Sequence, residues 1–338
     1  MIKKELFEVY NGKEIYRYTI EDGISVSIVT LGTRVTNIVV PDKNGVKTDV
    51  ALNMKTAADM LSIGSYMGAT VGRCGNRIGG EGFELNGKFY KLWHAEGAAH
   101  LHGGKHGFDT HVFDAAVNEA ENSVTMSTFS PDGEEGYPAD LKFSVKFTVR
   151  KSSLIIEYFA EADGDTVLNL TNHTYFNLNG EGNGTILDNV LKLNADGYLP
   201  TDKLLIPTGE VRSVENTPFD FRTAKPIGQD IENKDDDLLT AGGYDHNFRL
   251  TDSHFATAYS PLTGIKMDCY TDRPGVQFYA GNFLSGEVGK SVYPKRSGFC
   301  LETQLFPDAI HNPQWQSPIL RKGEKFYSKT EYSFSIEK

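Results

Sequence analysis

The chain has 338 residues, with 34 Lys and Arg against 45 Asp and Glu, and its formal net charge is −11 at pH 7. With 39% hydrophobic and 23% charged residues, it has the composition of an ordinary globular protein, which excludes disorder as its main state. The acidic balance disfavours nucleic acids and anionic membranes as partners, because both bind through clustered Lys and Arg. No apolar run approaches the roughly 20 residues that cross a bilayer.

Cysteine usage and the N-terminal segment bear on the compartment. The three cysteines, Cys74, Cys269 and Cys300, are odd in number and widely spaced, which is typical of free thiols in a reducing compartment. Residues 1–20 are charged and lack the apolar core of a signal peptide. We therefore expect a cytoplasmic protein. No linker, repeat or low-complexity tract divides the chain, so a single domain over residues 1–338 is predicted.

Alternation of apolar and polar residues, rather than helical periodicity, predicts the local structure. In chain order, the predicted elements are strands at 24–28 and 35–40, a helix at 56–61 capped by Thr56, a hairpin turning at Asn86-Gly87, and paired strands at 141–150 and 154–158. Residues 200–240 are polar and rich in turn formers, which predicts a long loop, with the triplet Asp235-Asp236-Asp237 in a solvated part of it. Many short strands with almost no helix indicate an all-β sandwich or barrel.

Histidines are concentrated in one segment. Five of the nine lie within 18 residues: His94, His100, His102, His106 and His111. A His-x-His pair on a strand points both rings to one side, as a metal site requires. No carboxylate follows before Asp109, however, so no metal site is predicted and loop histidines are the alternative. The glycine-rich segments 72–80 and 289–291 lack the spacing of nucleotide-binding loops, so no nucleotide cofactor is expected.

Residues 167–178 read as a strand with one apolar and one polar face. The apolar face carries Leu168, Leu170, Phe176 and Leu178, and the polar face carries Asn169, Thr171, His173, Tyr175 and Asn177. Solvated strands usually carry long charged side chains, and this polar face carries none. The pattern therefore favours a polar cleft over a solvent-facing strand.

Further polar groups occur on other predicted strands. Glu302 lies between apolar neighbours in 298–305, where it is either functional or a buried, hydrogen-bonded structural acid. Asp245 begins one strand, and Gln277 and Tyr279 share a face of another. Planar hydrogen-bonding groups mixed with aromatic rings suit a neutral polyol. A carboxylate and an imidazole in the same cleft indicate a general base and a general acid.

Six motifs in register resemble the aldose 1-epimerase, or galactose mutarotase, family from about residue 10 to the C-terminus. They are Asn76-Arg-Ile78, Leu101-His-Gly-Gly104, Thr171-Asn-His-Thr-Tyr-Phe-Asn-Leu178, Pro218-Phe-Asp-Phe-Arg222, Gly243-Tyr-Asp-His246 and Glu302-Thr-Gln-Leu-Phe-Pro-Asp-Ala309. The resemblance implies a large twisted antiparallel β-sandwich with the sugar in an open cleft on one sheet. It also implies cofactor-free interconversion of the α and β anomers of free aldohexoses, such as galactose and glucose, feeding hexose metabolism.

The resemblance carries roles to individual residues. It implies Glu302 as general base and His173 as general acid. The implied sugar-contacting residues are Asn76, Arg77, His102, Tyr175, Asp245 and Gln277. It gives no role to His94, His100, His106 or His111, and it names no metal ligand.

The chemistry sets expectations for the acid and the base. An ordinary glutamate is ionised at pH 7, and a histidine with a pKa near 6.5 keeps a protonated fraction. Arg77 has too high a pKa to transfer protons, so it is expected to position the substrate. His173 is expected to be held rigidly within a strand, and His102 more loosely among glycines.

Three other functions and the assembly stay open at this point. A phosphosugar epimerase would need a basic cluster for the phosphate. A glycosidase would use two carboxylates, which Glu302 and Asp245 could supply. A noncatalytic sugar-binding module would bind the same ligands without accelerating anomer exchange. The sequence does not choose between monomer and homodimer, nor among galactose, glucose, xylose and arabinose.

Overall fold

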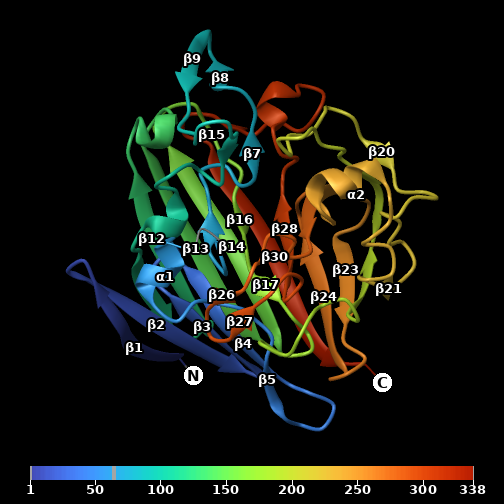
Figure 1. The fold of residues 1–338 in the computed structure, drawn as a ribbon. Coiled ribbons are helices and arrows are strands. Elements are labelled where there is room, and N and C mark those ends of the chain that lie inside the picture. The colour runs from blue at the N-terminus through green and yellow to red at the C-terminus, as the bar shows by residue number, and fades with distance from the viewer. Residues whose placement is uncertain (1, 63–65, 338) are drawn as a thin grey trace.

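In the computed structural model, residues 2–62 and 66–337 are described, and they form large antiparallel sheets packed in layers (Figure 1). The largest sheet has nine strands, in the order β11 (Asp114–Asn118), β12 (Ser123–Ser130), β13 (Leu141–Arg150), β14 (Ser153–Ala162), β30 (Lys325–Ile336), β24 (Ile265–Thr271), β23 (His254–Tyr259), β18 (Val190–Leu193) and β21 (Lys225–Pro226). A six-stranded sheet packs against it, in the order β17 (Tyr175–Phe176), β28 (Phe299–Gln304), β25 (Gly275–Tyr279), β22 (Asp245–Leu250), β19 (Ala195–Tyr198) and β20 (Arg212–Ser213). The predicted antiparallel β-sandwich is confirmed.

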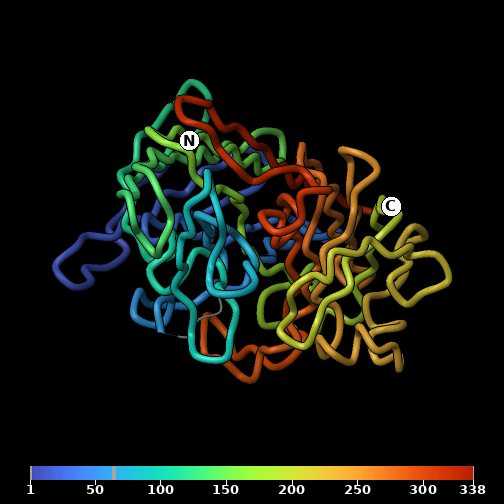
Figure 2. The backbone as a smooth tube through the Cα atoms, turned by 90° about the horizontal axis from the view of Figure 1, so that it is seen from above, coloured from blue at the N-terminus to red at the C-terminus, as the bar shows by residue number. Residues whose placement is uncertain are grey.

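A five-stranded sheet forms the N-terminal side, with β1 (Ile2–Tyr10), β2 (Lys13–Asp22), β3 (Ile24–Val29), β4 (Arg34–Pro41) and β5 (Lys47–Asp49) in chain order. Figure 2 shows this blue segment on one side of the molecule and the yellow segment around residues 200–225 on the other.

Short two-stranded ribbons complete the strands. They are β7 (Arg77–Ile78) with β10 (His100–Leu101), β6 (Thr70–Val71) with β16 (Thr171–Asn172), β15 (Thr166–Val167) with β29 (Ile319–Leu320), β8 (Gly82–Leu85) with β9 (Lys88–Lys91), and β26 (Glu287–Val288) with β27 (Val292–Tyr293). The helices found in the described residues are α1 (Ala57–Ser62), α2 (Asp236–Ala241) and three 3-10 turns at Phe108–Thr110, Glu134–Gly136 and Ala309–His311. In the described part of the chain, no helix is long and apolar enough to cross a membrane.

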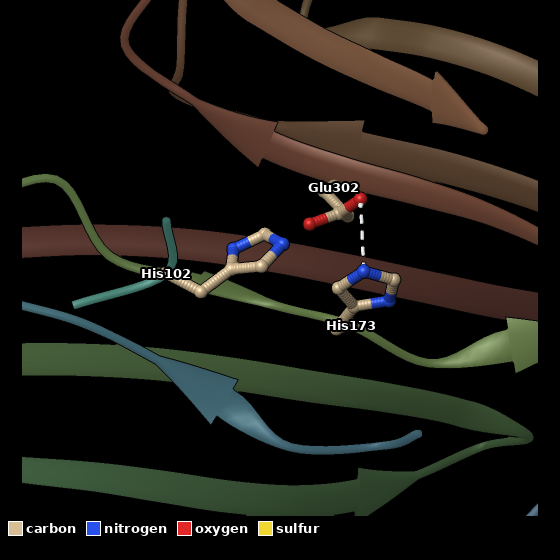
Figure 3. A group of neighbouring side chains, drawn as sticks. All are labelled: His102, His173 and Glu302. Carbon is tan, nitrogen blue, oxygen red and sulfur yellow. Dashed lines mark ion pairs between the residues drawn. The ribbon is translucent and has the colours of Figure 1, made fainter. Parts of the chain in front are cut away.

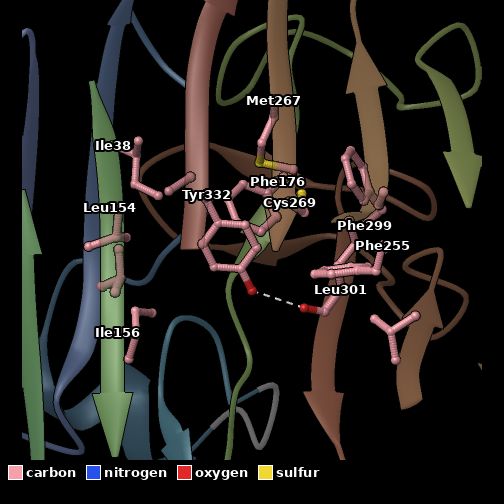
Figure 4. Packing of buried hydrophobic residues seen from close by; sticks show 14 of the residues in the cluster. Ile38, Leu154, Ile156, Phe176, Phe255, Met267, Cys269, Phe299, Leu301 and Tyr332 are labelled. Carbon is pink, nitrogen blue, oxygen red and sulfur yellow. Dashed lines mark hydrogen bonds between the residues drawn. The ribbon is translucent and has the colours of Figure 1, made fainter. Parts of the chain in front are cut away.

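The core lies between the nine-stranded and six-stranded sheets. Leu154 and Ile156 of β14 enter it from one side, and Phe299 and Leu301 of β28 from the other (Figure 4). The Tyr332 hydroxyl donates a hydrogen bond across this layer to the Leu301 carbonyl, at 2.9 Å. The buried phenol thus satisfies its polar end. The same bond links β30 of the nine-stranded sheet to β28, the strand that carries Glu302.

Several local predictions are confirmed. The strand predicted at 141–150 is β13, and its alternate residues from Leu141 to Val149 are buried. Both turn residues Asn86 (φ 53°) and Gly87 (φ 75°) take the left-handed conformation of a type I′ hairpin. Thr56 caps α1 by accepting a hydrogen bond from the Asp59 backbone N–H at 3.1 Å. All three cysteines are buried free thiols.

Two predictions of secondary structure were wrong. Residues 167–178 do not form one strand: they break into β15, β16 and β17, which pair with three different partners. The acidic triplet is not a solvated loop. Asp235 is the N-cap of α2, because its carboxylate accepts hydrogen bonds from the N–H groups of Asp237 and Leu238.

Candidate active site

A cavity of about 220 Å³ is lined in part by residues of β17, β28, β25 and β22 of the six-stranded sheet. This volume lies below the roughly 300–1,000 Å³ of sites for drug-sized ligands and suits a small ligand. Seven of the eight predicted site residues line it: Asn76, Arg77, His102, His173, Tyr175, Asp245 and Glu302. The fold therefore gathers residues that are more than 200 positions apart in the sequence.

The first wall of the cavity, the sheet wall, consists of Tyr175, Asp245 and Glu302. Strands β28 and β25 pair so that Glu302 stands opposite Gln277. Gln277 does not line the cavity itself. Its side-chain amide donates a hydrogen bond to Asp245 Oδ1 at 2.8 Å and thus orients Asp245.

The second wall, the ribbon wall, consists of Asn76, Arg77 and His102. Strands β7 and β10 hold it together, with Leu101 opposite Arg77. The His102 N–H donates to the Asn76 carbonyl at 2.9 Å, and the Asn76 N–H donates to His102 Nδ1 at 3.0 Å. His102 is only 6% exposed. The expectation that glycines would leave His102 loose was wrong, because this reciprocal pair of hydrogen bonds fixes its ring.

Gly103 follows His102 and allows this geometry. Its φ is +90°, and a Cβ atom at this position would lie 1.9 Å from the carbonyl oxygen of Gly72. Glycine is therefore required for two independent reasons, conformation and close backbone approach.

Glu302 and His173 face one another across the cavity (Figure 3). Glu302 Oε1 lies 3.6 Å from His173 Nε2, and the two residues are 2% and 5% exposed. This separation is too long for a direct hydrogen bond. Glu302 Oε2 has no hydrogen-bond partner among the described residues. The pair is thus placed so that a ligand group between the two side chains can exchange protons with each.

Burial shifts the pKa values of Glu302 and His173 in the directions that favour the uncharged form of each side chain. It raises the pKa of Glu302 well above its ordinary value, nearby Asp245 raises it further, and Arg77 opposes the shift. Burial lowers the pKa of His173 to about 3. The expectation of ordinary pKa values was therefore wrong, because both side chains lose their hydration. Both shifts favour the uncharged form of each side chain, a protonated carboxyl and a neutral imidazole.

The His173 ring is fixed from several sides. It stacks on Tyr175 with ring centroids 5.0 Å apart, and Tyr66 stacks at 6.1 Å. Its Nδ1 lies 3.4 Å from the Cys300 sulfur. His173 lies between β16 and β17 rather than within a strand, so ring packing and not a strand ladder provides the predicted rigidity.

The asparagines of 167–178 do not face the cavity, contrary to the prediction. The Asn169 amide donates to the Leu305 carbonyl at 3.1 Å and accepts from the Leu305 N–H at 2.9 Å. The Asn177 amide donates to the Ser297 carbonyl at 2.9 Å. These amides satisfy backbone groups where the strand is broken, which explains their buried positions.

The histidine cluster of 94–111 is not one group in space. His100 Nδ1 lies 2.5 Å from the Trp93 carbonyl oxygen, and its Nε2 lies 2.6 Å from the Tyr137 hydroxyl. His94 pairs instead with Glu81 at 3.2 Å, and His111 with Glu134 at 3.3 Å. Only His102 of this segment lines the cavity.

His102, His173 and Glu302 form a group whose possible ligand atoms lie within 4.8 Å of one another. A metal-binding histidine normally donates a hydrogen bond through its other ring nitrogen. His102 Nδ1 instead accepts one from the Asn76 N–H, which places the ring proton on Nε2 in the neutral form. This tautomer donates to a ligand hydroxyl and does not fit a metal, so a metal-free site stays our prediction.

Six cavity-lining residues carried no role in the sequence interpretation: Tyr66, Leu101, Tyr279, Phe283, Leu284 and Glu287. Tyr66 packs against His102 with ring centroids 4.6 Å apart, and Glu287 accepts hydrogen bonds from Ser285. The sequence pattern placed Tyr279 on the same strand face as Gln277, and this shared face could have identified Tyr279 as a site residue. No alternation marks Tyr66 or Phe283, because both lie outside the strands.

Comparison with known proteins adds an independent line of evidence. The family described as aldose 1-epimerase matches residues 16–333. A galactose mutarotase of Bos taurus is 42% identical, covering 93% of this chain and 92% of its own. An aldose 1-epimerase of Haemophilus influenzae is 37% identical, covering 99% and 100%. The crystal structure of a galactose 1-epimerase from Lactobacillus acidophilus superposes with a TM-score of 0.89 at 26% identity, covering 100% of this chain and 99% of that one.

Proposed function

This chain belongs to the aldose 1-epimerase family and is an isomerase, and from this premise we propose that it interconverts the α and β anomers of free galactose and glucose. The observation that carries the proposal is the buried Glu302–His173 pair, 3.6 Å apart, in a cavity of about 220 Å³. The anomeric hydroxyl and the ring oxygen are both bonded to C1, so two groups this close can reach both.

In the proposed mechanism, Glu302 is the general base and His173 the general acid. Glu302 takes the proton of the anomeric hydroxyl while His173 protonates the ring oxygen, and the C1–O5 bond opens to give the free aldehyde. Rotation about C1–C2 presents the other carbonyl face, and closure reverses the two proton transfers. No electrons are lost or gained, and the proton count of the pair is restored.

The shifted pKa values fit a pair that shares one proton through its substrate. In the empty cavity, burial favours a neutral carboxyl and a neutral imidazole. Sugar hydroxyls that donate to Glu302, together with the positive charge of Arg77, favour the carboxylate and so move the proton to His173. Because 3.6 Å separates the two side chains, the proton passes through the sugar rather than directly between them.

The other cavity residues suit an uncharged polyol. Asn76 and His102 on one wall and Tyr175 and Asp245 on the other offer donors and acceptors to ring hydroxyls. Among the described lining residues, Arg77 is the only Lys or Arg, against the acids Asp245, Glu287 and Glu302. This balance disfavours a phosphorylated sugar, which would require compensating positive charge.

Polarimetry on freshly dissolved α-D-galactose and α-D-glucose tests the proposal. We expect the wild-type protein to accelerate the approach to the equilibrium rotation, and Glu302→Gln to leave the rate near that of buffer. A wild-type protein that binds galactose without changing this rate would be a sugar-binding module instead. Release of nitrophenol from a nitrophenyl galactoside would indicate a glycosidase.

The broader assignments rest on the same proposal. We propose that residues 1–338 act as one domain, as a monomer or homodimer, in the cytoplasm, where the reaction feeds hexose metabolism. Size-exclusion chromatography with light scattering decides between monomer and dimer.

A further inference from the structure

The ribbon wall is a small unit that the large sheets do not contain. Among the strands of residues 2–62 and 66–337, β7 and β10 pair only with each other, over two residues each. Nevertheless, they carry Arg77 and adjoin Asn76 and His102, three of the residues that we propose to bind the sugar. A two-residue ribbon does not hold its own position, so other contacts must fix it relative to Glu302.

Asp308 makes contacts of this kind, on both sides of Ile78. Its backbone N–H donates to the Arg77 carbonyl at 3.1 Å, and its carboxylate Oδ1 accepts from the Gly79 N–H at 2.9 Å. Asp308 therefore pairs with the β7 edge opposite to β10. It is 8% exposed, so these hydrogen bonds are protected from water.

His311 holds the Asp308 carboxylate in turn. His311 Nδ1 lies 2.7 Å from Asp308 Oδ1, and its Nε2 lies 3.0 Å from the Gly82 carbonyl oxygen. Both ring nitrogens face acceptors, and only the protonated ring donates from both. His311 thus connects the carboxylate to the start of the β8–β9 hairpin.

Asp308 also lies six residues after Glu302 along the chain, just beyond the end of β28. The segment that carries the proposed base therefore also contacts the backbone of the strand that carries Arg77. Contacts at both ends of this segment fix the distance between the sheet wall and the ribbon wall.

We propose that Asp308, held by His311, is a positioning residue that sets Arg77 against Glu302 for sugar binding. This inference rests on the proposed function, because it concerns the same cavity. Asp308 does not line the cavity and transfers no proton. Its loss is therefore expected to weaken sugar binding and to leave the turnover of bound sugar largely intact.

The test variant is Asp308→Gly. Asp308 has a φ of 58°, where an alanine would add backbone strain and a glycine does not. We expect KM for galactose to rise about tenfold and kcat to change less than about threefold. A misplacement of 1 Å can cost up to about 100-fold, and loss of Asp308 leaves the β7–β10 pairing in place. Asp308→Asn keeps an acceptor oxygen for Gly79 and His311 and is expected to restore KM to within about threefold of wild type.

Asp165→Ala is the matched control. The Asp165 carboxylate also fixes a hairpin, the β8–β9 hairpin. It accepts hydrogen bonds from Asn86 in the turn of that hairpin and from Arg321 and Lys322. It touches neither wall of the cavity. Its removal is expected to lower Tm without changing KM, which separates positioning from general destabilisation.

A double-mutant cycle gives the deciding measurement. Calorimetric titration with 1,5-anhydrogalactitol, a sugar that has no anomeric hydroxyl and does not open, reports Kd independently of catalysis. In an Arg77→Leu background, Asp308→Gly is expected to weaken Kd by less than about twofold, because residues that act through one another are not additive. A full tenfold loss in that background, or an unchanged KM in Asp308→Gly alone, would overturn the positioning role while wild-type mutarotation stands. Absence of wild-type mutarotation would overturn the proposed function and this inference together.

Discussion

The two walls of the cavity are built in different ways. The sheet wall belongs to a six-stranded sheet, where cross-strand register places Glu302 beside Gln277 and Gln277 beside Asn247. The ribbon wall belongs to two strands of two residues and depends on side chain–backbone contacts such as that between His102 and Asn76.

This difference indicates different roles in proton transfer and in sugar binding. A long ladder fixes Glu302 through many neighbours, which suits proton transfer, because a base must stay within hydrogen-bond reach of one atom. His173 lies outside the strands and is fixed by ring packing instead. A clamped ribbon is fixed at few points, and it carries residues that contact hydroxyl groups. We therefore expect removal of Glu302 or His173 to lower kcat and substitutions in the ribbon wall to raise KM.

The largest effect is expected for the proton-transfer pair. Removing either functional group, by Glu302→Gln or His173→Asn, should lower kcat by about 10²–10⁴-fold, because one of the two proton transfers loses its group. The double variant should be little slower than the worse single variant, since both groups serve one step. Polarimetric kcat values test this, and a Glu302→Gln variant with more than a third of wild-type turnover would refute the assignment.

The pH dependence of kcat/KM sharpens the account of this pair. The pair holds a single proton between the pKa of His173, lowered to about 3, and the raised pKa of Glu302. Below that range a second proton blocks the base, and above it the acid is lost. We expect activity to persist from pH 6.5 down to about pH 4, with the alkaline limit at the raised carboxyl pKa. The rate without enzyme must be subtracted at each pH, and an inflection near 6.5 would show an ordinary imidazole instead.

His102→Asn probes the ribbon wall. It should raise KM about tenfold through the loss of one hydrogen bond to a sugar hydroxyl, with a smaller loss of kcat than His173→Asn. The alkaline limb of the kcat profile should be unchanged, because His102 is not the acid. If His102→Asn removes that limb and His173→Asn retains it, the two histidines have exchanged roles.

Chelation is expected to have no effect. The His102 tautomer set by Asn76 does not fit a metal ligand, and the proposed proton transfers need no Lewis acid. Activity should therefore survive exhaustive treatment with EDTA followed by gel filtration. Loss of activity that added zinc restores would instead make His102, His173 and Glu302 a metal site.

The sequence by itself determined those features that depend on near neighbours in the chain. Alternation located β13, the Asn86-Gly87 pair its hairpin, and Thr56 the cap of α1. Seven of the eight predicted site residues line the cavity, because the family motifs in which they lie could be matched position by position.

Tertiary structure decided what depends on contacts between distant segments. It broke 167–178 into three pieces, because three different strands pair with it and asparagine amides satisfy the gaps. It also shifted the pKa of Glu302 upward and that of His173 downward, since a pKa follows burial as well as residue type. It also placed Tyr66 over His102 and Asp308 behind Arg77. The local pattern of residues along the sequence does not predict such contacts, because each one forms only when segments far apart in the chain pack together.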